Sequence, residues 1–180
     1  MRSREMDYVN KLEKIVLGWA KNVPHLPTNG QKWLADNAWW IVLVGAILSG
    51  IAVLVSLGGL FTLISLEGAV SNAYYVTASY SGLAIANAAV SLVFLVLNGL
   101  LLAIAVKPLQ AKLKKGWVLL FMTLLLEALS VLVHAVLTFN VVSFIVSILF
   151  GAIALAIAAY FIAEIHGQFA HPATRPTKKA

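Results

Sequence analysis

The fold is decided by residues 117–163, which read WVLLFMTLLLEALSVLVHAVLTFNVVSFIVSILFGAIALAIAAYFIA and contain only two acidic or basic residues, Glu127 and His134. An ionised side chain at the centre of a bilayer costs at least about 2.5 kcal/mol, so such a run predicts membrane-spanning helices. A single helix of this length would reach about 70 Å, more than twice the hydrocarbon core. Two spans fit instead, at about 117–138 and 142–164.

The first half of the chain contains two further runs without charge. The run from Ala38 to Leu66 predicts a span at about 39–62. The run from Gly68 to Val106 is too long for one span, and it begins with small polar residues and tyrosines over 68–82, which favour an interfacial loop. The remainder predicts a span at about 83–106.

The composition of the whole chain agrees with a membrane protein. Of 180 residues, 61% are hydrophobic and 11% are charged, whereas a soluble domain has about a quarter charged residues. The expected fold is therefore an all-α integral membrane protein with a four-helix transmembrane bundle over 38–166. The chain has no cysteine, which excludes disulfides and thiolate metal sites.

The basic residues give the orientation of this bundle. All thirteen Lys and Arg residues lie in 1–37, in the connecting loop 107–116 and in the tail 167–180, which are on one side of the membrane if there are four spans. The positive-inside rule then predicts that both termini are cytoplasmic. No N-terminal signal pattern and no N-glycosylation sequon occur, which favours a prokaryotic cytoplasmic membrane. The lysines expected near lipid headgroups are Lys11, Lys14, Lys21, Lys112, Lys114 and Lys115.

The segment 1–37 is expected to be helical and to lie at the membrane surface. Apolar residues recur at helical spacing over 5–21, opposite a basic face, and Pro24 ends this amphipathic helix. A second short helix is expected from Thr28 or Asn29 to Asp36. The amphipathic helix either binds anionic lipid or packs under its own bundle, and the sequence leaves both open. The expected interfacial anchors are Trp19, Trp33, Trp39, Trp40, Tyr74, Tyr75 and Trp117.

Polar residues inside the predicted spans are the candidate functional site. Glu127 lies near the middle of its span, and intramembrane ionisable residues are functional candidates by default. Two hypotheses follow: Glu127 and His134 form a proton or cation path, or a neutral Glu127 hydrogen-bonds Asn98 or a backbone carbonyl and holds the bundle together. The three remaining histidines, by contrast, show no metal-ligand spacing. The full candidate set is Glu127, Ser130 and His134 on one span, and Asn87, Ser91 and Asn98 on another.

Small residues at four-residue spacing predict close helix packing. Such stripes let helix backbones approach each other in lipid. They do not tell whether the neighbouring helix belongs to the same chain or to another copy. The residues concerned are Ala46 and Gly50 on the first span, and Ser143, Ser147 and Gly151 on the last.

The expected function is non-catalytic, because no catalytic, phosphate-binding or dinucleotide-binding motif occurs. No cofactor and no metal are expected. We expect a self-associating protein or an accessory subunit of a membrane assembly, whose partners are the bilayer with its anionic lipids and either further copies or another membrane protein. The alternatives are a proton-coupled transporter or small ion channel that uses Glu127 and His134, or an anionic-lipid-binding, membrane-shaping protein. The net charge of +6 is explained by orientation, not by nucleic acid.

Overall fold

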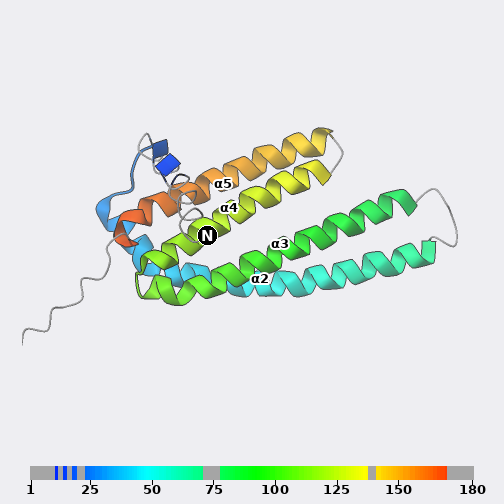
Figure 1. Ribbon diagram of the computed structural model, residues 1–180, viewed down its shortest axis with the longest axis horizontal. Helices are drawn as coiled ribbons and strands as arrows, with labels where there is room; N and C mark the ends of the chain where they lie inside the picture. The colour runs from blue at the N-terminus through cyan, green and yellow to red at the C-terminus, as the bar shows by residue number, and fades with distance from the viewer. Residues whose placement is uncertain are drawn as a thin grey trace, which may run out of the picture.

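The described part of the chain is helical apart from short connections. The computed structural model describes residues 23–70, 78–137 and 141–169, together with residues 11, 14, 15, 18 and 19. Each of the four long helices in these ranges is long and apolar enough to cross a membrane, so the prediction of four such helices is confirmed (Figure 1). The helices are α2 (Thr28–Val70), α3 (Ala78–Gln110), α4 (Lys114–Leu137) and α5 (Val141–Phe169).

The helices extend beyond the predicted spans, and α2 differs most from expectation. The separate short helix expected before Asp36 and the first span are one continuous helix of 43 residues. Lys32 and Asp36 lie on exposed positions of its first turns. A charged side chain therefore does not mark where this helix begins or ends. The interfacial loop expected over 68–82 is also shorter, because α2 continues to Val70 and α3 begins at Ala78.

The connection between α3 and α4 is a tight turn, not the ten-residue loop expected over 107–116. Lys112 adopts the left-handed conformation, with φ of 49°, which commonly ends a helix. The amide of Leu113 donates to the carbonyl of Pro108 at 2.9 Å. Gly116 lies so close to the end of α3 that an added Cβ would be 2.7 Å from the backbone nitrogen of Leu109. The two helices therefore meet at a position where only glycine fits.

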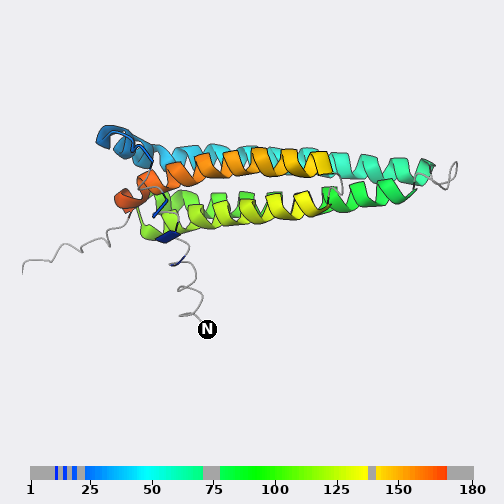
Figure 2. The same cartoon turned by 90° about the horizontal axis from the view of Figure 1, so that it is seen from above.

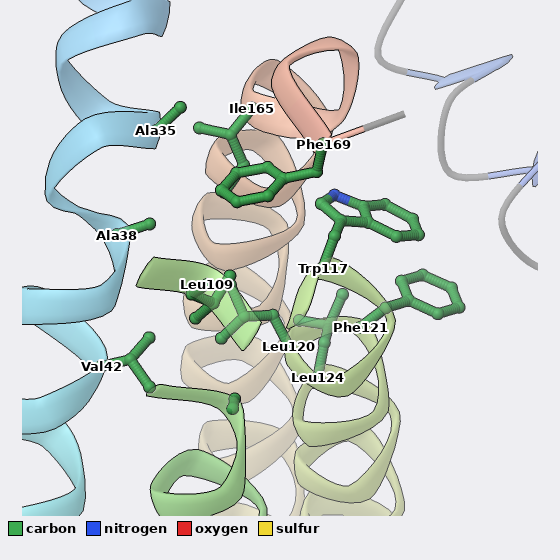
Figure 3. Packing of buried hydrophobic residues seen from close by; sticks show 11 residues of the cluster. Ala35, Ala38, Val42, Leu109, Trp117, Leu120, Phe121, Leu124, Ile165 and Phe169 are labelled. Atoms are coloured by element: carbon green, nitrogen blue, oxygen red, sulfur yellow. The ribbon is translucent and has the colours of Figure 1, made fainter. Parts of the chain in front are cut away.

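Consecutive helices pack side by side, and α2 meets α5 mainly where α2 begins and α5 ends. The buried apolar residues gather at this end, which we call the packed end (Figure 3). Towards the opposite end, the α2–α3 pair and the α4–α5 pair diverge (Figure 1), and Figure 2 shows α5 on the side of α2 and α4 on the side of α3. The buried cluster consists of Ala35, Ala38, Val42, Ala105, Leu109, Trp117, Leu120, Phe121, Leu124, Ile165 and Phe169.

Trp117 is the centre of this cluster, although the sequence predicted it as an anchor at the bilayer surface. Its side chain is 1% exposed and is stacked on Phe121, with ring centroids 5.4 Å apart. The ring of His166 meets it edge-on at 4.6 Å. Its Nε1 donates to the carbonyl of Ile162 at 2.8 Å, which supplies the partner that a buried indole N–H requires. Trp117 therefore ties α4 to α5 instead of facing lipid headgroups.

Candidate functional site

A cavity of about 310 Å³ lies among α3, α4 and α5, next to the packed end. Glu127, Asn98 and Thr123 supply its polar groups. Its remaining lining is apolar and includes several small residues of α5: Leu102, Leu124, Val131, Gly151, Ala154, Leu155, Ala158 and Ile162. The glutamate that the sequence singled out therefore lines a partly open cavity between helices.

Glu127 has few partners for a carboxylate. Asn98 donates from Nδ2 to its Oε2 at 3.2 Å, which joins α3 to α4 at this level. An ionised carboxylate offers about four lone-pair positions, so this single bond leaves most of its acceptor capacity available. The side chain of Glu127 is exposed at the open side of the cavity. The predicted pairing of Glu127 with Asn98 is present, and the carboxylate also has room for a ligand.

The cavity is closed towards the packed end. Leu124 belongs both to the cavity lining and to the buried cluster, so the packed side chains form the floor of the cavity. Along α4, Glu127 lies ten residues beyond Trp117, or about 15 Å at the rise of a helix. Gly151 contributes to the shape of the cavity, because a Cβ there would lie 2.6 Å from Cγ1 of Val131. Its lack of a side chain brings α5 close to α4.

His134 belongs to a second polar group, nearer the diverging end. Its Nε2 hydrogen-bonds Oγ of Ser91, and its Nδ1 lies 2.7 Å from the carbonyl of Ser130. Oγ of Ser91 also lies within hydrogen-bond distance of the carbonyl of Asn87, at 2.8 Å. Because a hydroxyl has one hydrogen, Ser91 donates either to that carbonyl or to Nε2. His134 and Glu127 are seven residues apart, about 10 Å along α4, so these are two polar groups at two depths.

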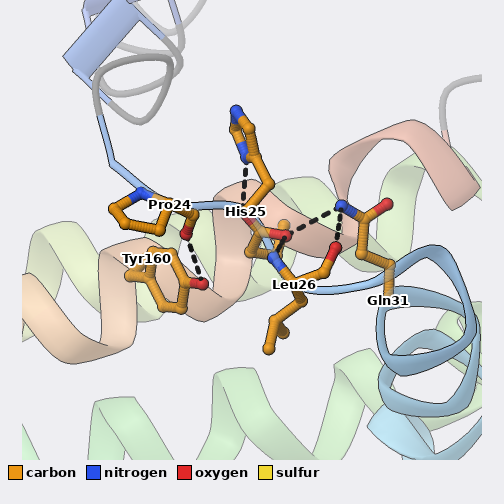
Figure 4. Close-up of polar contacts among 6 residues, drawn as sticks. Pro24, His25, Leu26, Gln31 and Tyr160 are labelled. Carbon is orange, nitrogen blue, oxygen red and sulfur yellow. Dashed lines mark hydrogen bonds and ion pairs between the residues drawn. The ribbon is translucent and has the colours of Figure 1, made fainter.

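The structure contains a third polar group that the sequence did not reveal, at the end of α5 (Figure 4). The side chain of Glu164 is completely buried. Its Oε1 accepts from Nδ1 of His25 at 2.7 Å, and its Oε2 accepts from the amide of Leu26 at 3.0 Å and from Nε2 of Gln31 at 2.9 Å. Nearby, the hydroxyl of Tyr160 donates to the carbonyl of Pro24 at 2.9 Å. We call Pro24, His25, Leu26, Gln31, Tyr160 and Glu164 the Glu164 cluster.

This cluster fixes the segment before α2 to the end of α5. Gln31 also donates to the carbonyl of Leu26 at 3.2 Å, so the first turn of α2 is part of the same network. A buried carboxylate is tolerated only when hydrogen bonds replace its hydration, and three donors do so here. In the sequence Glu164 only marked the end of a charge-free run, and His25 showed no ligand spacing. Their separation of 139 residues leaves no local signal of the contact.

The other predicted positions are spread over several surfaces. Gly50 is exposed and an added Cβ there would meet nothing, whereas Ser49 on the next face approaches Gly99 of α3, where an added Cβ would lie 3.1 Å from Cβ of Ser49. Ala46 and Ser147 are half-buried, and the side chain of Ser143 lies outside the described part. Among the predicted anchors, Trp19, Trp33 and Trp40 are exposed and Trp39 is half-buried. The headgroup lysines Lys11, Lys14, Lys112, Lys114 and Lys115 are exposed, and Lys21, Tyr74 and Tyr75 lie outside the described residues.

The described residues include no group of three or more His, Cys, Asp or Glu side chains that could hold a metal ion. Two buried amide oxygens, Oδ1 of Asn87 and Oδ1 of Asn98, have no hydrogen-bond partner within the described part. Comparison with protein-family models, with curated proteins and with solved structures finds no match. The geometry of the site is therefore the basis on which a function is proposed.

Proposed function

We propose that the protein is a multi-pass membrane protein that carries a proton or a small cation across the bilayer, with Glu127 as the binding group. The observation that supports this most is the cavity of about 310 Å³ in which the Glu127 carboxylate has one hydrogen-bond partner. A carboxylate that served only to hold helices together would be expected to use its acceptors on neighbouring helices. Most acceptor positions of the Glu127 carboxylate instead face the cavity.

The depth of the polar groups supports a stepwise route. His134 lies nearer the diverging end of the bundle, Glu127 lies near the middle of α4, and Glu164 lies at the packed end. The packed aromatic side chains of the buried cluster lie between Glu127 and the Glu164 cluster. In this proposal a cation reaches Glu127 from the diverging end and leaves only after the packed end has opened, as alternating access requires.

The proposed orientation places the packed end in the cytoplasm. Helix ends and turns at this end carry exposed lysines, namely Lys32, Lys107, Lys112, Lys114 and Lys115. The connections at the opposite end, residues 71–77 and 138–140, contain no Lys or Arg. The positive-inside rule therefore favours cytoplasmic termini, and anionic headgroups are natural partners of these lysines.

The test is cation flux into liposomes that contain the purified protein. We expect Glu127-dependent proton or monovalent-cation flux, at least about tenfold lower in Glu127→Gln, since the neutral amide keeps the size of the side chain and removes its charge. The control is Asp36→Asn, which neutralises an exposed carboxylate paired with Lys112 outside the cavity. No flux in the wild type at any pH, or equal flux in wild type and Glu127→Gln, would refute the proposal.

A second candidate function is self-association through α2, as a homo-oligomer or an accessory subunit. It is favoured by two exposed glycines of this helix, Gly50 and Gly58, at which an added Cβ would meet no atom within 4 Å. Gly50 borders a hollow that α2 shares with α3. Exposed glycines allow a second helix to approach closely in lipid. Leu substitution at Gly50 is expected to abolish in-membrane crosslinks between copies. A strictly monomeric wild type in detergent with no crosslinked adducts in membranes would refute self-association.

A further inference from the structure

We propose that the ligand of the Glu127 cavity is a monovalent organic cation, a protonated amine with an apolar body, which enters from the bilayer between α2 and α5. This inference takes the Glu127 binding site from the proposed function, but it does not depend on transport. It follows from the charge, the lining, the volume and the accessible side of the cavity.

The charge of the ligand follows from the only ionisable side chain among the described lining residues, Glu127. An ammonium group has N–H donors that match the acceptor positions left open on this carboxylate. The charge-assisted bond would also replace the hydration that the carboxylate loses at this depth. One carboxylate balances one positive charge, which favours a monovalent cation over a polyamine.

The other lining residues indicate that the remainder of the ligand is apolar. Hard inorganic cations such as Mg²⁺ and Ca²⁺ take six or more oxygen ligands, and here Asn98 and Thr123 are the only polar side chains beside Glu127 among the lining residues. The hydroxyl of Thr123 already donates to the carbonyl of Leu120 at 2.7 Å. Leucine, isoleucine, valine and alanine side chains form the remaining wall and would leave a hydrated ion unsolvated. They suit a hydrocarbon group, which gains free energy on burial.

The volume sets the size of this group. A cavity of about 150 Å³ lined by apolar side chains binds benzene, and this cavity is about 310 Å³. A single aromatic ring with a short aminoalkyl arm therefore fits. On the α5 side of the cavity, Gly151, Ala154 and Ala158 present almost no side chain.

The side of entry follows from the helix contacts. No residue of α2 lines the cavity. Helix α2 meets α5 through residues such as Ala38 and Val42 at the packed end, near Ile165. Beyond this contact, at the depth of Glu127, the side between α2 and α5 faces the acyl chains. Lipid headgroup amines stay at the interface, about 15 Å from Glu127 if Trp117 marks the packed end, so the ligand is a free amine that partitions into the bilayer.

The experiment measures binding of matched small probes to the full-length protein in nanodiscs of neutral lipid, with empty nanodiscs as the partition control. Benzylamine is the protonated probe, benzyl alcohol is its neutral counterpart, and sodium chloride tests for an inorganic cation. We expect benzylamine to bind at least about tenfold more tightly than benzyl alcohol, because a hydrogen bond to a charged group contributes about 1.5–3 kcal/mol and 1.4 kcal/mol is tenfold. Sodium should not compete.

Two variants locate the binding site. Glu127→Gln should weaken benzylamine binding at least about tenfold and leave benzyl alcohol unchanged. Ala154→Leu should weaken both probes, because it fills the cavity from an exposed position of α5 outside the buried cluster. Asp36→Asn is the matched control and should bind both probes as the wild type does. If Glu127→Gln perturbs folding, Ala154→Leu still tests the location.

The outcomes separate the two proposals. Equal binding of benzylamine and benzyl alcohol, or benzylamine binding that Glu127→Gln does not change, overturns the inferred ligand class. Sodium competition at low millimolar concentration also overturns it and indicates an inorganic-ion site. Glu127-dependent proton flux without amine binding would keep the proposed transport function and reject this inference. Glu127-dependent amine binding without any flux would keep the inferred ligand class and reject the proposed transport function.

Discussion

Replacing Glu164 by alanine tests whether the buried carboxylate fixes the start of α2 to the end of α5. The substitution removes the acceptor for three hydrogen bonds, from His25, Leu26 and Gln31, at 2.7 to 3.0 Å. The buried cluster around Trp117 does not include Glu164 and stays intact. We therefore expect local release of the segment before α2, and no global unfolding.

The size of the effect can be worked out from the exposure of the donors. A hydrogen bond to a charged group contributes about 1.5–3 kcal/mol, but a donor that returns to water recovers much of this. The side chain of His25 is 54% exposed and so contributes little. The amide of Leu26 and the side chain of Gln31 lie in a partly buried setting and contribute most. A local loss of about 2–4 kcal/mol follows, by the same scale.

Hydrogen exchange of the first turn of α2 is the suitable assay. The amides of Gly30 and Gln31 donate to the carbonyl of Pro27 at 2.7 and 3.0 Å and do not touch Glu164. A loss of 2–4 kcal/mol should speed their exchange roughly 30- to 800-fold, at about 1.4 kcal/mol per factor of ten. The control Asp36→Asn, which removes an exposed ion pair, should change exchange by less than about fivefold. Unchanged exchange of Gly30 and Gln31 in Glu164→Ala would show that the cluster does not hold this segment.

Two further predictions concern the packed end and are measured as free energies of unfolding in detergent. Gly116→Ala should cost about 1–3 kcal/mol, because the new Cβ would lie 2.7 Å from the backbone of Leu109, which cannot move aside. The control Gly50→Ala should cost none, because a Cβ there meets nothing. Equal free energies of unfolding for the two variants would contradict the tight turn. Trp117→Phe should cost about 1–2 kcal/mol through loss of the hydrogen bond to Ile162, and an unchanged midpoint would contradict a structural role for the indole N–H.

The four helices could be predicted because lipid leaves the backbone few options. A chain in hydrocarbon must satisfy its own amides and carbonyls, so a long charge-free run is either one helix or several. Membrane thickness required a break in this run, and Asn140, which tolerates a left-handed turn, placed it near residues 138–140. Helix α4 ends at Leu137 and α5 begins at Val141, on either side of it. The helix ends elsewhere were not predictable in this way, because Lys32 and Asp36 are compatible with a helix that continues into water.

The candidate site was predictable only in part. The cost of a carboxylate in the bilayer pointed to Glu127, and helical periodicity placed Asn98 on a stripe that faces it. The cavity beside them depends on Gly151 and the alanines of α5, whose packing partner the sequence does not specify. Glu164 was not predicted as a functional residue, because its charge only indicated the end of an apolar run. Its role depends on a turn about 139 residues earlier in the chain, and tertiary contacts of this kind have no periodic signal.

Helix α4 joins the apolar packing to the polar chemistry. Its first half contributes Trp117 and Phe121 to the buried cluster, and its second half carries Glu127 and His134, both bonded to α3. Polar links at two depths and a tight turn at Gly116 bind α3 and α4 into one unit. The contact between α2 and α5 has no such turn and is confined to one end. A motion that exposed Glu127 to the packed end by separating α2 from α5 would therefore have to break the hydrogen bonds of Glu164.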